Sequence, residues 1–217
     1  MTSVLQWLRD NADDLLNWTV QHTWMSLVPV GLAFLIALPL GYLVSRAKLA
    51  TDVLLMIFGL VYAVPSLALF VAMPIFLGTK ILDPTNIVAA LTIYAVALLV
   101  RSVVDGLRSA PGVVIESADA LGYGRWRRLL RVELPLAMPV IFAGLRTVTV
   151  ANIALVSVGT VVGTGALGTL FEIGFNRAFL TPIIVGMGLS LLLAVLADLL
   201  LVGLQRLTLP WYRGART

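Results

Sequence analysis

The sequence predicts an all-α membrane protein with about five transmembrane helices and a short cytoplasmic helix–turn–helix between the third and the fourth. The chain is 60% hydrophobic and only 12% charged, whereas a soluble domain usually carries about 25% charged residues. Apolar runs of roughly 20 residues recur, which is the length of a helix that crosses a bilayer. A polar stretch in the middle, ESADALGYGRWRRLLRVELP, interrupts this pattern. A location in the membrane therefore explains the composition better than the large core of a soluble protein does.

The expected spans share an apolar composition and a length near that of a bilayer-crossing helix. They lie at about 23–45, 52–77, 86–104, 134–158 and 182–204. With their connections they form a transmembrane domain over 23–207. An external or interfacial segment at 1–22 precedes this domain, and a cytoplasmic tail at 208–217 follows it.

The N-terminal segment is polar and amphipathic, and it lacks the short apolar region and small-residue cleavage site of a secretory signal. We therefore expect no cleavable signal. The single histidine, His22, comes just before the first apolar run, so we expect it to contact solvent at the membrane interface. One histidine and no cysteine exclude a histidine-rich metal site, a disulfide and thiolate chemistry.

Prolines interrupt the first two spans. Pro29 and Pro39 lie in the first span, and Pro65 and Pro74 lie in the second. A proline inside a helix removes a backbone hydrogen bond and kinks the helix. Two interpretations stay open: kinks tolerated among packed helices, or unwound backbone that lines a pathway, as in transporters.

The later spans carry a few polar residues. Arg146 lies about twelve residues into the fourth span, and an intramembrane charge is costly enough to be a functional candidate; packing against another helix is the alternative. Asn152 lies beside the same helical face. Asp105 follows Arg101 by four residues, which predicts an intrahelical ion pair. Asp198 in the fifth span is expected to pair across the bundle.

The segment 159–180 is too rich in glycine to be a simple span, so we predict a broken helix or a re-entrant piece. Its GTGALG at 163–168 matches G-x-G-x-x-G. A dinucleotide site would need a preceding strand in a soluble βαβ unit, which this context does not offer. We interpret the glycines as close packing or as part of an external gate.

Basic residues are distributed unevenly between the two sides of the predicted membrane. Of the fifteen Lys and Arg residues, eleven fall on one side, three (Arg9, Lys80 and Arg177) on the other, and Arg146 within a span. The eleven are Arg46, Lys48, Arg101, Arg108, Arg125, Arg127, Arg128, Arg131, Arg206, Arg213 and Arg216. The positive-inside rule then places the N-terminus outside and the C-terminus and the central polar stretch in the cytoplasm.

The central stretch predicts two short helices, at 113–121 and 125–132, joined by a turn at Gly122-Tyr123-Gly124. The second helix is expected to end at Leu134-Pro135, where the fourth span begins. A basic surface loop that binds anionic headgroups is one interpretation of its arginines, and a docking site for another protein is the other.

This stretch resembles the coupling motif in permease subunits of bacterial ABC importers. That motif reads Glu-Ala-Ala, three residues, Gly, nine residues, Ile-x-Leu-Pro. Here Glu116-Ser117-Ala118 is followed after three residues by Gly122, and after nine more by Val132-Glu133-Leu134-Pro135. Ser117 replaces an alanine and Val132 replaces the isoleucine. The resemblance implies the type I ABC importer permease fold.

The resemblance also implies that the two short helices dock into a groove on an ATPase subunit. Small residues permit close approach and a tight turn, and Glu116 offers a carboxylate to a basic partner, unless it caps a helix or pairs with a nearby arginine. The residues implied in coupling are Glu116, Ser117, Ala118, Gly122, Tyr123, Gly124, Leu134 and Pro135.

Three further stretches, YAVPSLALF, LPLAMPVIFAGLRTVTV and GTVVGTGALGTL, are similar to permeases that import the osmoprotectants glycine betaine, carnitine and choline. The resemblance runs from about Thr23 to Leu207. Tyr62 and Tyr94 could then offer aromatic faces to a quaternary amine, although packing is the alternative. Arg146 could gate the pathway or meet the carboxylate of a zwitterionic betaine. The pathway candidates are Tyr62, Pro65, Tyr94, Arg146 and Asn152.

The resemblance implies several partners. Neither Lys48 nor Lys80 follows a glycine, so the chain has no Walker A loop and is expected to be a transport subunit rather than an enzyme. ATP and Mg would be bound by partner ATPase subunits, and no catalytic residue, metal or cofactor is expected in this chain. The other expected partners are a second permease, identical or homologous, an external substrate-binding protein and membrane lipid, but no nucleic acid.

Three alternatives stay open. Methionine-type permeases share the short form and a GxGxLG segment, so methionine or another small solute is a rival substrate. An osmotically gated ion channel would conduct without an ATPase. A membrane scaffold would use the polar stretch only for docking.

Overall fold

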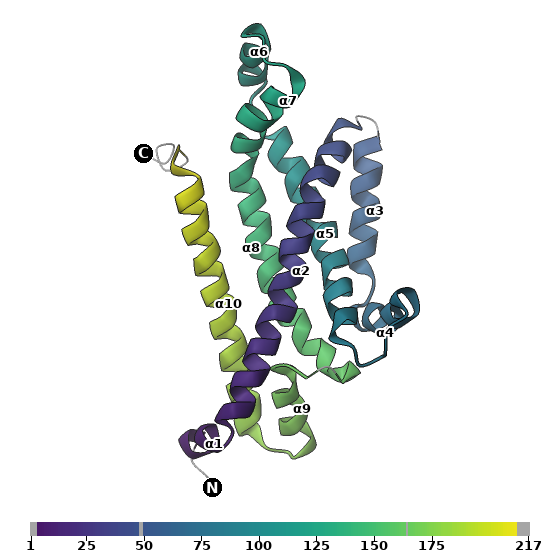
Figure 1. Ribbon diagram of the computed structural model, residues 1–217, viewed down its shortest axis with the longest axis vertical. Coiled ribbons are helices and arrows are strands. Elements are labelled where there is room, and N and C mark those ends of the chain that lie inside the picture. Colours follow the sequence, from purple (N-terminus) through teal and green to yellow (C-terminus); the bar gives the residue numbers. More distant parts are fainter. Residues whose placement is uncertain (1–3, 48–49, 164, 212–217) are drawn as a thin grey trace. The chain divides into compact units, whose positions relative to one another are not determined.

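The computed structural model describes residues 4–47, 50–163 and 165–211, and every element within them is a helix (Figure 1). In chain order these are α1 (Val4–Asp10), α2 (Ala12–Arg46), α3 (Thr51–Ala63), α4 (Ser66–Leu77), α5 (Pro84–Arg108), α6 (Gly112–Ala120), α7 (Arg125–Arg128), the π-helical turn η2 (Leu129–Glu133), α8 (Leu134–Gly159), the 3-10 turn η3 (Thr160–Val162), α9 (Gly168–Asn176) and α10 (Leu180–Thr208). Lys48, Thr164 and most of the predicted tail, with Arg213 and Arg216, lie outside the described residues.

Within these ranges four helices are long and apolar enough to cross a bilayer, or five spans if α3 and α4 count as one broken span. The four are α2, α5, the continuous helix Arg125–Val162 and α10. This confirms the predicted all-α membrane fold with about five spans. The helix α2 begins at Ala12, eleven residues before the predicted first span at Thr23, and it continues through Pro29 and Pro39.

The second span is broken at Pro65, as the sequence predicted. Pro65 has the extended dihedral angles φ −59° and ψ 128°, and α4 starts at the next residue. Because proline fixes φ and disfavours the helical region for the residue before it, α3 stops at Ala63. Pro74, by contrast, lies inside α4 without ending it.

The chain forms two compact units, each built from three separate segments. The first contains Met1–Gly31, Val64–Ile93 and Thr149–Asp198; the second contains Leu32–Ala63, Tyr94–Val148 and Leu199–Thr217. The long helices α2, α5, α8 and α10 therefore contribute residues to both.

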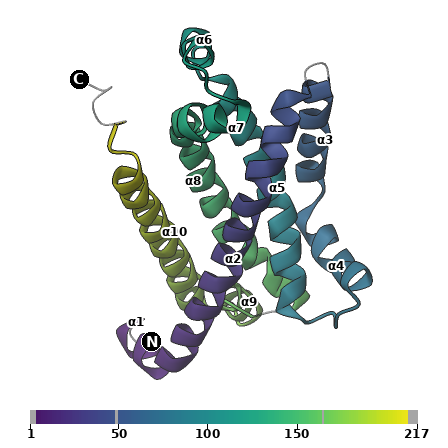
Figure 2. The ribbon, with the colours of Figure 1, turned by 45° about the horizontal axis from the view of Figure 1, so that its top comes forward.

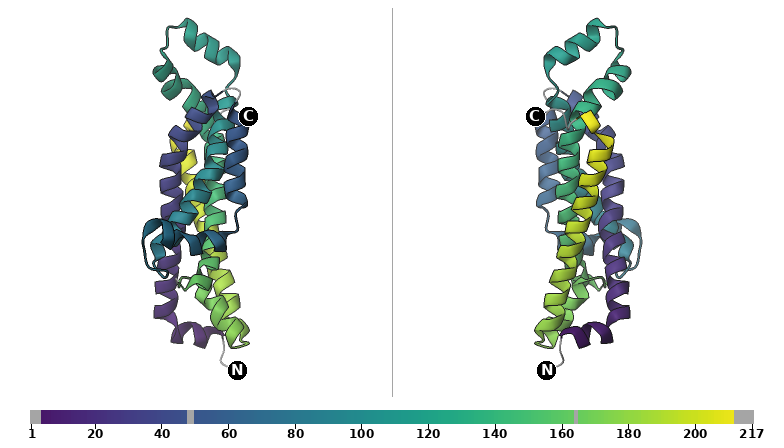
Figure 3. Two further views of the ribbon diagram at one scale, coloured as in Figure 1. Left: turned by 90° about the vertical axis from the view of Figure 1, so that its right-hand side faces the viewer. Right: turned by 90° about the vertical axis from the view of Figure 1, so that its left-hand side faces the viewer.

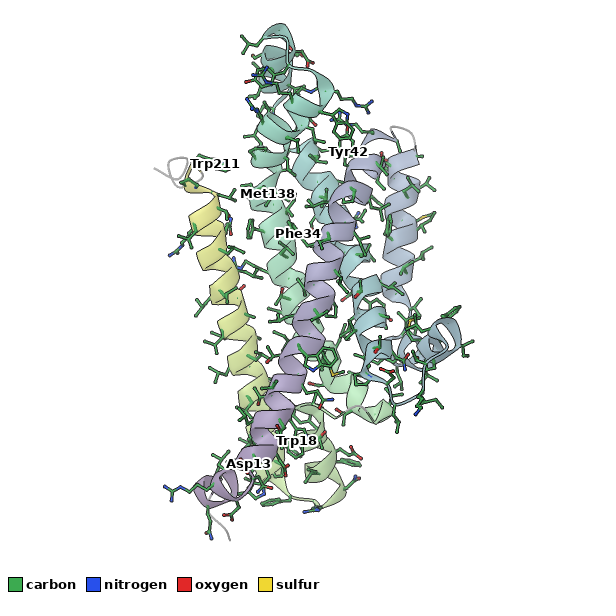
Figure 4. All side chains as sticks on the ribbon, viewed as in Figure 1. Asp13, Trp18, Phe34, Tyr42, Met138 and Trp211 are labelled. Carbon is green, nitrogen blue, oxygen red and sulfur yellow. The ribbon has the colours of Figure 1, made fainter. Side chains whose placement is uncertain are left out.

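The first unit has an apolar cluster of Leu15, Leu167, Leu170 and Val185, against which Trp18 packs (Figure 4 labels Trp18 on α2). The interrupted segment after α8 consists of η3, a left-handed glycine at Gly163 and the short helix α9. This confirms that 159–180 is not a simple span.

His22 also belongs to the first unit, and the expected solvent contact is wrong. Its side chain is fully buried, and Nε2 lies 2.9 Å from the carbonyl oxygen of Ile153 on α8. The helix α2 begins well before His22, so the histidine lies within a packed helix face instead of at a helix end. A partner 131 positions away leaves no local signal in the sequence.

The second unit holds its helices together by close contacts at small residues. A Cβ atom at Gly106 of α5 would lie 2.9 Å from the carbonyl oxygen of Ala137 on α8, and glycines at Gly41 and Gly144 are similarly enclosed. Membrane helices commonly pack in this way because small residues let the backbones approach.

Two local expectations in the second unit are also wrong. No ion pair joins Arg101 and Asp105 among the described residues; both side chains are exposed, and an acid C-terminal to its base is the weaker order on a helix. The second short helix does not end at Leu134-Pro135 but continues through η2 into α8.

Candidate functional site

The central polar stretch forms a helical hairpin, which we call the coupling segment (residues 111–135). Its first arm is α6, and its second arm is α7 with η2 (Figures 2 and 3). Pro111 has φ −61° and ψ 134° and precedes the first residue of α6. The predicted first arm at 113–121 differs from α6 by one residue at each end. The predicted second arm at 125–132 begins where α7 begins and stops one residue before the end of η2.

Gly122 closes the first arm because only a left-handed residue fits there. Its φ is +76°, a region that costs an L-residue roughly 1–2 kcal/mol. The N–H of Tyr123 donates to the carbonyl of Ala118 at 3.0 Å, and the N–H of Gly122 donates to that of Asp119 at 2.9 Å. This pair of bonds is the Schellman motif that commonly ends helices.

The first arm is mostly exposed. Ala118 is buried, whereas Glu116, Ser117 and Leu121 are exposed. The Ser117 hydroxyl donates back to the carbonyl of Val113. Among the described residues Glu116 neither caps a helix nor pairs with an arginine, so its carboxylate is accessible to a partner.

The two arms are joined by charged side chains. Arg128 donates to Asp119 on the first arm through Nη1 at 2.5 Å, and to Glu133 through Nε at 2.8 Å. Glu133 is almost fully buried and also accepts from Arg46 of α2 at 2.5 Å. One buried carboxylate thus ties the coupling segment to α2, and the pair Arg128–Asp119 joins the two arms.

The second arm joins α8 through a π-helical turn. The N–H of Leu134 donates to the carbonyl of Leu129, five residues back. Pro135 has no N–H to continue the regular pattern, and the wider turn absorbs this loss. Leu134 and Pro135 are therefore the junction between the coupling segment and the membrane helix.

Two of the predicted pathway residues meet in the second unit. The rings of Tyr62 and Tyr94 lie edge to face, with their centroids 5.6 Å apart and an interplanar angle of 82°. Tyr94 is buried, while Tyr62 is 40% exposed. The ring of Tyr62 thus packs on a buried ring and is itself partly accessible.

The other three candidates have different surroundings. Pro65 is exposed at the break between α3 and α4. Arg146 is half-buried on α8. Asn152 is buried in the first unit, where its amide donates to the carbonyl of Ser26 on α2 at 3.4 Å. This contact and the nearby contact between His22 and Ile153 join the same two helices.

Comparison with known families shows to which family the chain belongs. Residues 30–209 match the family described as the inner membrane component of binding-protein-dependent transport systems. The chain belongs to this family. It is therefore a membrane permease subunit of a transport system. The matched range includes the coupling segment and every span except residues 12–29 of α2.

Several characterised relatives match the permease over nearly its whole length. The osmoprotectant import permease protein OsmW of Salmonella typhimurium is 36% identical, covering 95% of this chain and 97% of the relative. The glycine betaine/carnitine/choline transport system permease protein OpuCB of Bacillus subtilis is 30% identical, covering 97% and 95%. The choline transport system permease protein OpuBB of Bacillus subtilis is 32% identical with the same coverage.

Solved structures show the same fold. The inward-facing MetNI methionine ABC transporter has a chain that matches the permease with a TM-score of 0.74 at 22% identity, covering 94% of this chain and 99% of that chain. An amino acid ABC transporter with histidines matches with a TM-score of 0.75 at 16% identity. At these identities the likeness establishes the type I importer permease fold alone.

The sequence did not reveal the charged network of the permease. Arg46, Asp119, Arg128 and Glu133 were each visible as charges, but Arg46 and Glu133 are 87 residues apart. Glu133 is the variable position of the motif's Ile-x-Leu-Pro end. An acid there, next to a run of arginines, is the only local sign of the network.

Proposed function

We propose that the permease forms, with a second identical or homologous permease, the membrane pathway of an ATP-driven importer for a quaternary-amine osmoprotectant such as glycine betaine, choline or carnitine. The observation that carries this proposal is the similarity of nearly the entire chain to osmoprotectant, carnitine and choline permeases. In the same proposal, the coupling segment transmits the movement of the ATPase subunits to the membrane helices. The fold similarity to the methionine transporter does not favour methionine as substrate.

In this proposal two ATPase subunits bind ATP and Mg, and each docks on a coupling segment. The first arm offers the exposed Glu116 and Ser117 on α6 and the exposed Leu121 directly after it, and Gly122 shapes its end. Because an ion pair joins the two arms and the second arm is continuous with α8, a rotation of the ATPase would move α8 as a lever. The pathway would then alternate between outward and inward access, with an external binding protein delivering the substrate.

The orientation belongs to the same proposal. The excess of Lys and Arg on the side of the coupling segment supports a cytoplasmic coupling segment and C-terminus, with the N-terminus outside. ATP is available on that side, so the position of the coupling segment and the charge distribution agree.

The pair Tyr62–Tyr94 is the proposed contact for a quaternary ammonium on its way through the membrane. An aromatic face attracts a cation by about 0.5–1 kcal/mol at an exposed site. Tyr62→Leu should therefore lower the uptake rate of choline about two- to fivefold, while Tyr62→Phe, which keeps the ring, should stay near the wild-type rate. Equal losses in both variants, at equal permease levels in the membrane, would remove Tyr62 from the pathway.

The deciding experiment is ATP hydrolysis by the reconstituted complex of permease, ATPase and binding protein, titrated with glycine betaine, choline, carnitine and methionine. Stimulation by a quaternary amine and not by methionine is the expected result. Stimulation by methionine alone would keep the transport role and overturn the substrate. Conductance by the permease alone, without ATPase subunits, would instead support a channel.

A further inference from the structure

An apolar groove of about 390 Å³ opens in the second unit beside the coupling segment. Its walls come from α2, α5, the second arm of the coupling segment and the start of α8, and they include Leu38, Tyr42, Val103, Trp126, Leu130 and Leu134. No polar surface lines it. Leu130 and Trp126 are each more than 60% exposed, so the groove is open to an occupant that is itself hydrocarbon.

Tyr42 marks the polar end of this groove. Its ring lies 5.8 Å from the ring of Trp126, and its hydroxyl accepts a hydrogen bond from Nε of Arg125 at 3.1 Å. The guanidinium of Arg46 lies 5.1 Å from the centre of the same ring. Figure 4 labels Tyr42 near the C-terminal end of α2. Two arginines therefore gather where the apolar wall ends.

The two arginines differ in how far their charge is neutralised. Arg46 pairs with the buried carboxylate of Glu133. Arg125 is exposed, and within the described ranges its polar partner is the neutral Tyr42 hydroxyl. Its positive charge is thus available to an anion at the mouth of the groove.

We propose that this groove binds an anionic phospholipid, with an acyl chain along the apolar wall and the phosphate on Arg125. The order of groups supports this occupant: hydrocarbon wall, then the aromatic pair Tyr42–Trp126, then a cation, which is the order of layers from the bilayer core to its surface. Anionic lipids are concentrated in the cytoplasmic leaflet and attract basic residues there. The choice of leaflet rests on the proposed orientation, whereas the site itself does not depend on the transported substrate.

A lipid in this position would contact both α2 and the second arm of the coupling segment. Trp126 follows Arg125 directly and lies across from Tyr42. The bound lipid would therefore brace the coupling segment against α2 from the membrane side, in addition to the buried Glu133.

The test measures lipid binding to the purified full-length permease in detergent by native mass spectrometry. The probes are dioleoyl phosphatidylglycerol, which is anionic, and dioleoyl phosphatidylcholine, which is zwitterionic. Arg125→Gln should weaken phosphatidylglycerol binding about fivefold, and Arg125→Lys should restore most of it. Arg127→Gln is the matched control, because Arg127 lies in the same short helix and stacks on Tyr123 instead of Tyr42.

A second variant tests the groove without changing charge. Leu130→Trp should fill the groove and lower binding of phosphatidylglycerol, and the exposure of Leu130 makes this change compatible with folding.

The proposal would be overturned by any of three results. These are equal binding of the two lipids, equal losses in Arg125→Gln and Arg127→Gln, and no effect of either Arg125→Gln or Leu130→Trp. Cross-linking of two permeases through Leu130→Cys, with no lipid retained, would also overturn the proposal. The occupant of the groove would then be a second copy of the permease. Because the readout is binding, failure of the transport assignment would leave it unchanged.

Discussion

At the scale of single residues, Gly122 and Gly124 offer a matched pair in the turn of the coupling segment. A side chain at either would meet open space, but Gly122 has φ +76° and Gly124 has φ −65°. Gly122→Ala should therefore cost about 1 kcal/mol of local stability and loosen the end of α6, while Gly124→Ala should be nearly neutral.

The measurement for this pair is substrate-stimulated ATP hydrolysis of the reconstituted complex. We expect Gly122→Ala to lower stimulation severalfold at normal levels of assembled complex, and Gly124→Ala to leave it unchanged. Full stimulation in Gly122→Ala would show that the geometry of this turn is not used in coupling.

Glu133 is the residue on which the charged network depends. Removing one partner from a buried ion pair costs about 3–5 kcal/mol, and the lower end applies because Arg46 is about one-third exposed. Glu133→Gln should then lower the thermal unfolding midpoint of the purified permease by about 6 °C or more. Asp119→Asn is the control, since Asp119 is half exposed and such pairs contribute about 0–1 kcal/mol. Similar midpoints for the two variants would contradict the central role of Glu133.

At the scale of elements, the π-helical turn η2 sets the rotation of the coupling segment about the axis of α8. Pro135→Ala supplies an N–H that can bond to the carbonyl of Arg131 and convert η2 to regular α-helix. Losing the extra residue of the wide turn would rotate the second arm by about 100° and misplace the docking surface. We expect a folded permease with strongly reduced ATP-driven uptake.

Pro139 provides the control for this prediction, because it also lies within α8 but outside the π-helical turn. Pro139→Ala should retain uptake close to the wild type. Loss of uptake in Pro139→Ala together with full uptake in Pro135→Ala would show that the register of η2 does not matter.

The elements were predictable to the extent that their signals are local. The coupling hairpin follows from Pro111, Gly122 and the change from apolar to charged residues, and the break at Pro65 follows from the fixed φ of proline. The contacts that position these elements were not predictable. The burial of His22 depends on Ile153, and the anchoring of Glu133 depends on Arg46, and a single sequence carries no signal for such distant partners.

The same contrast between local signals and distant contacts applies to the candidate site. A coupling role for 116–135 could be proposed from the sequence because its spacing is a pattern of residues along the chain, and this role stays a prediction. The meeting of Tyr62 and Tyr94 could be stated only as two separate candidates, since the two residues come from different helices. The expected pair of Arg101 and Asp105 was wrong because spacing alone does not decide which rotamers exposed side chains adopt.

At the scale of the whole molecule, the second arm of the coupling segment and the membrane helix α8 form one continuous element from Arg125 to Val162. Arg146 lies on this helix, thirteen positions after Glu133. In the proposed function, a displacement at the ATPase would therefore reach the intramembrane part of the permease through one continuous helix.

The orientation of this element in the membrane gives the last prediction. Because the chain has no cysteine, single cysteines report on one site each. Arg127→Cys in the coupling segment should react with a membrane-impermeant maleimide only after cells are permeabilised, and Arg177→Cys, at the end of α9, should react in intact cells. Both side chains are exposed, so failure to react reports on the membrane barrier, and labelling after denaturation controls for expression. Labelling of Arg127→Cys in intact cells would place the coupling segment outside, where no ATPase could reach it, and would overturn the orientation and the coupling role together.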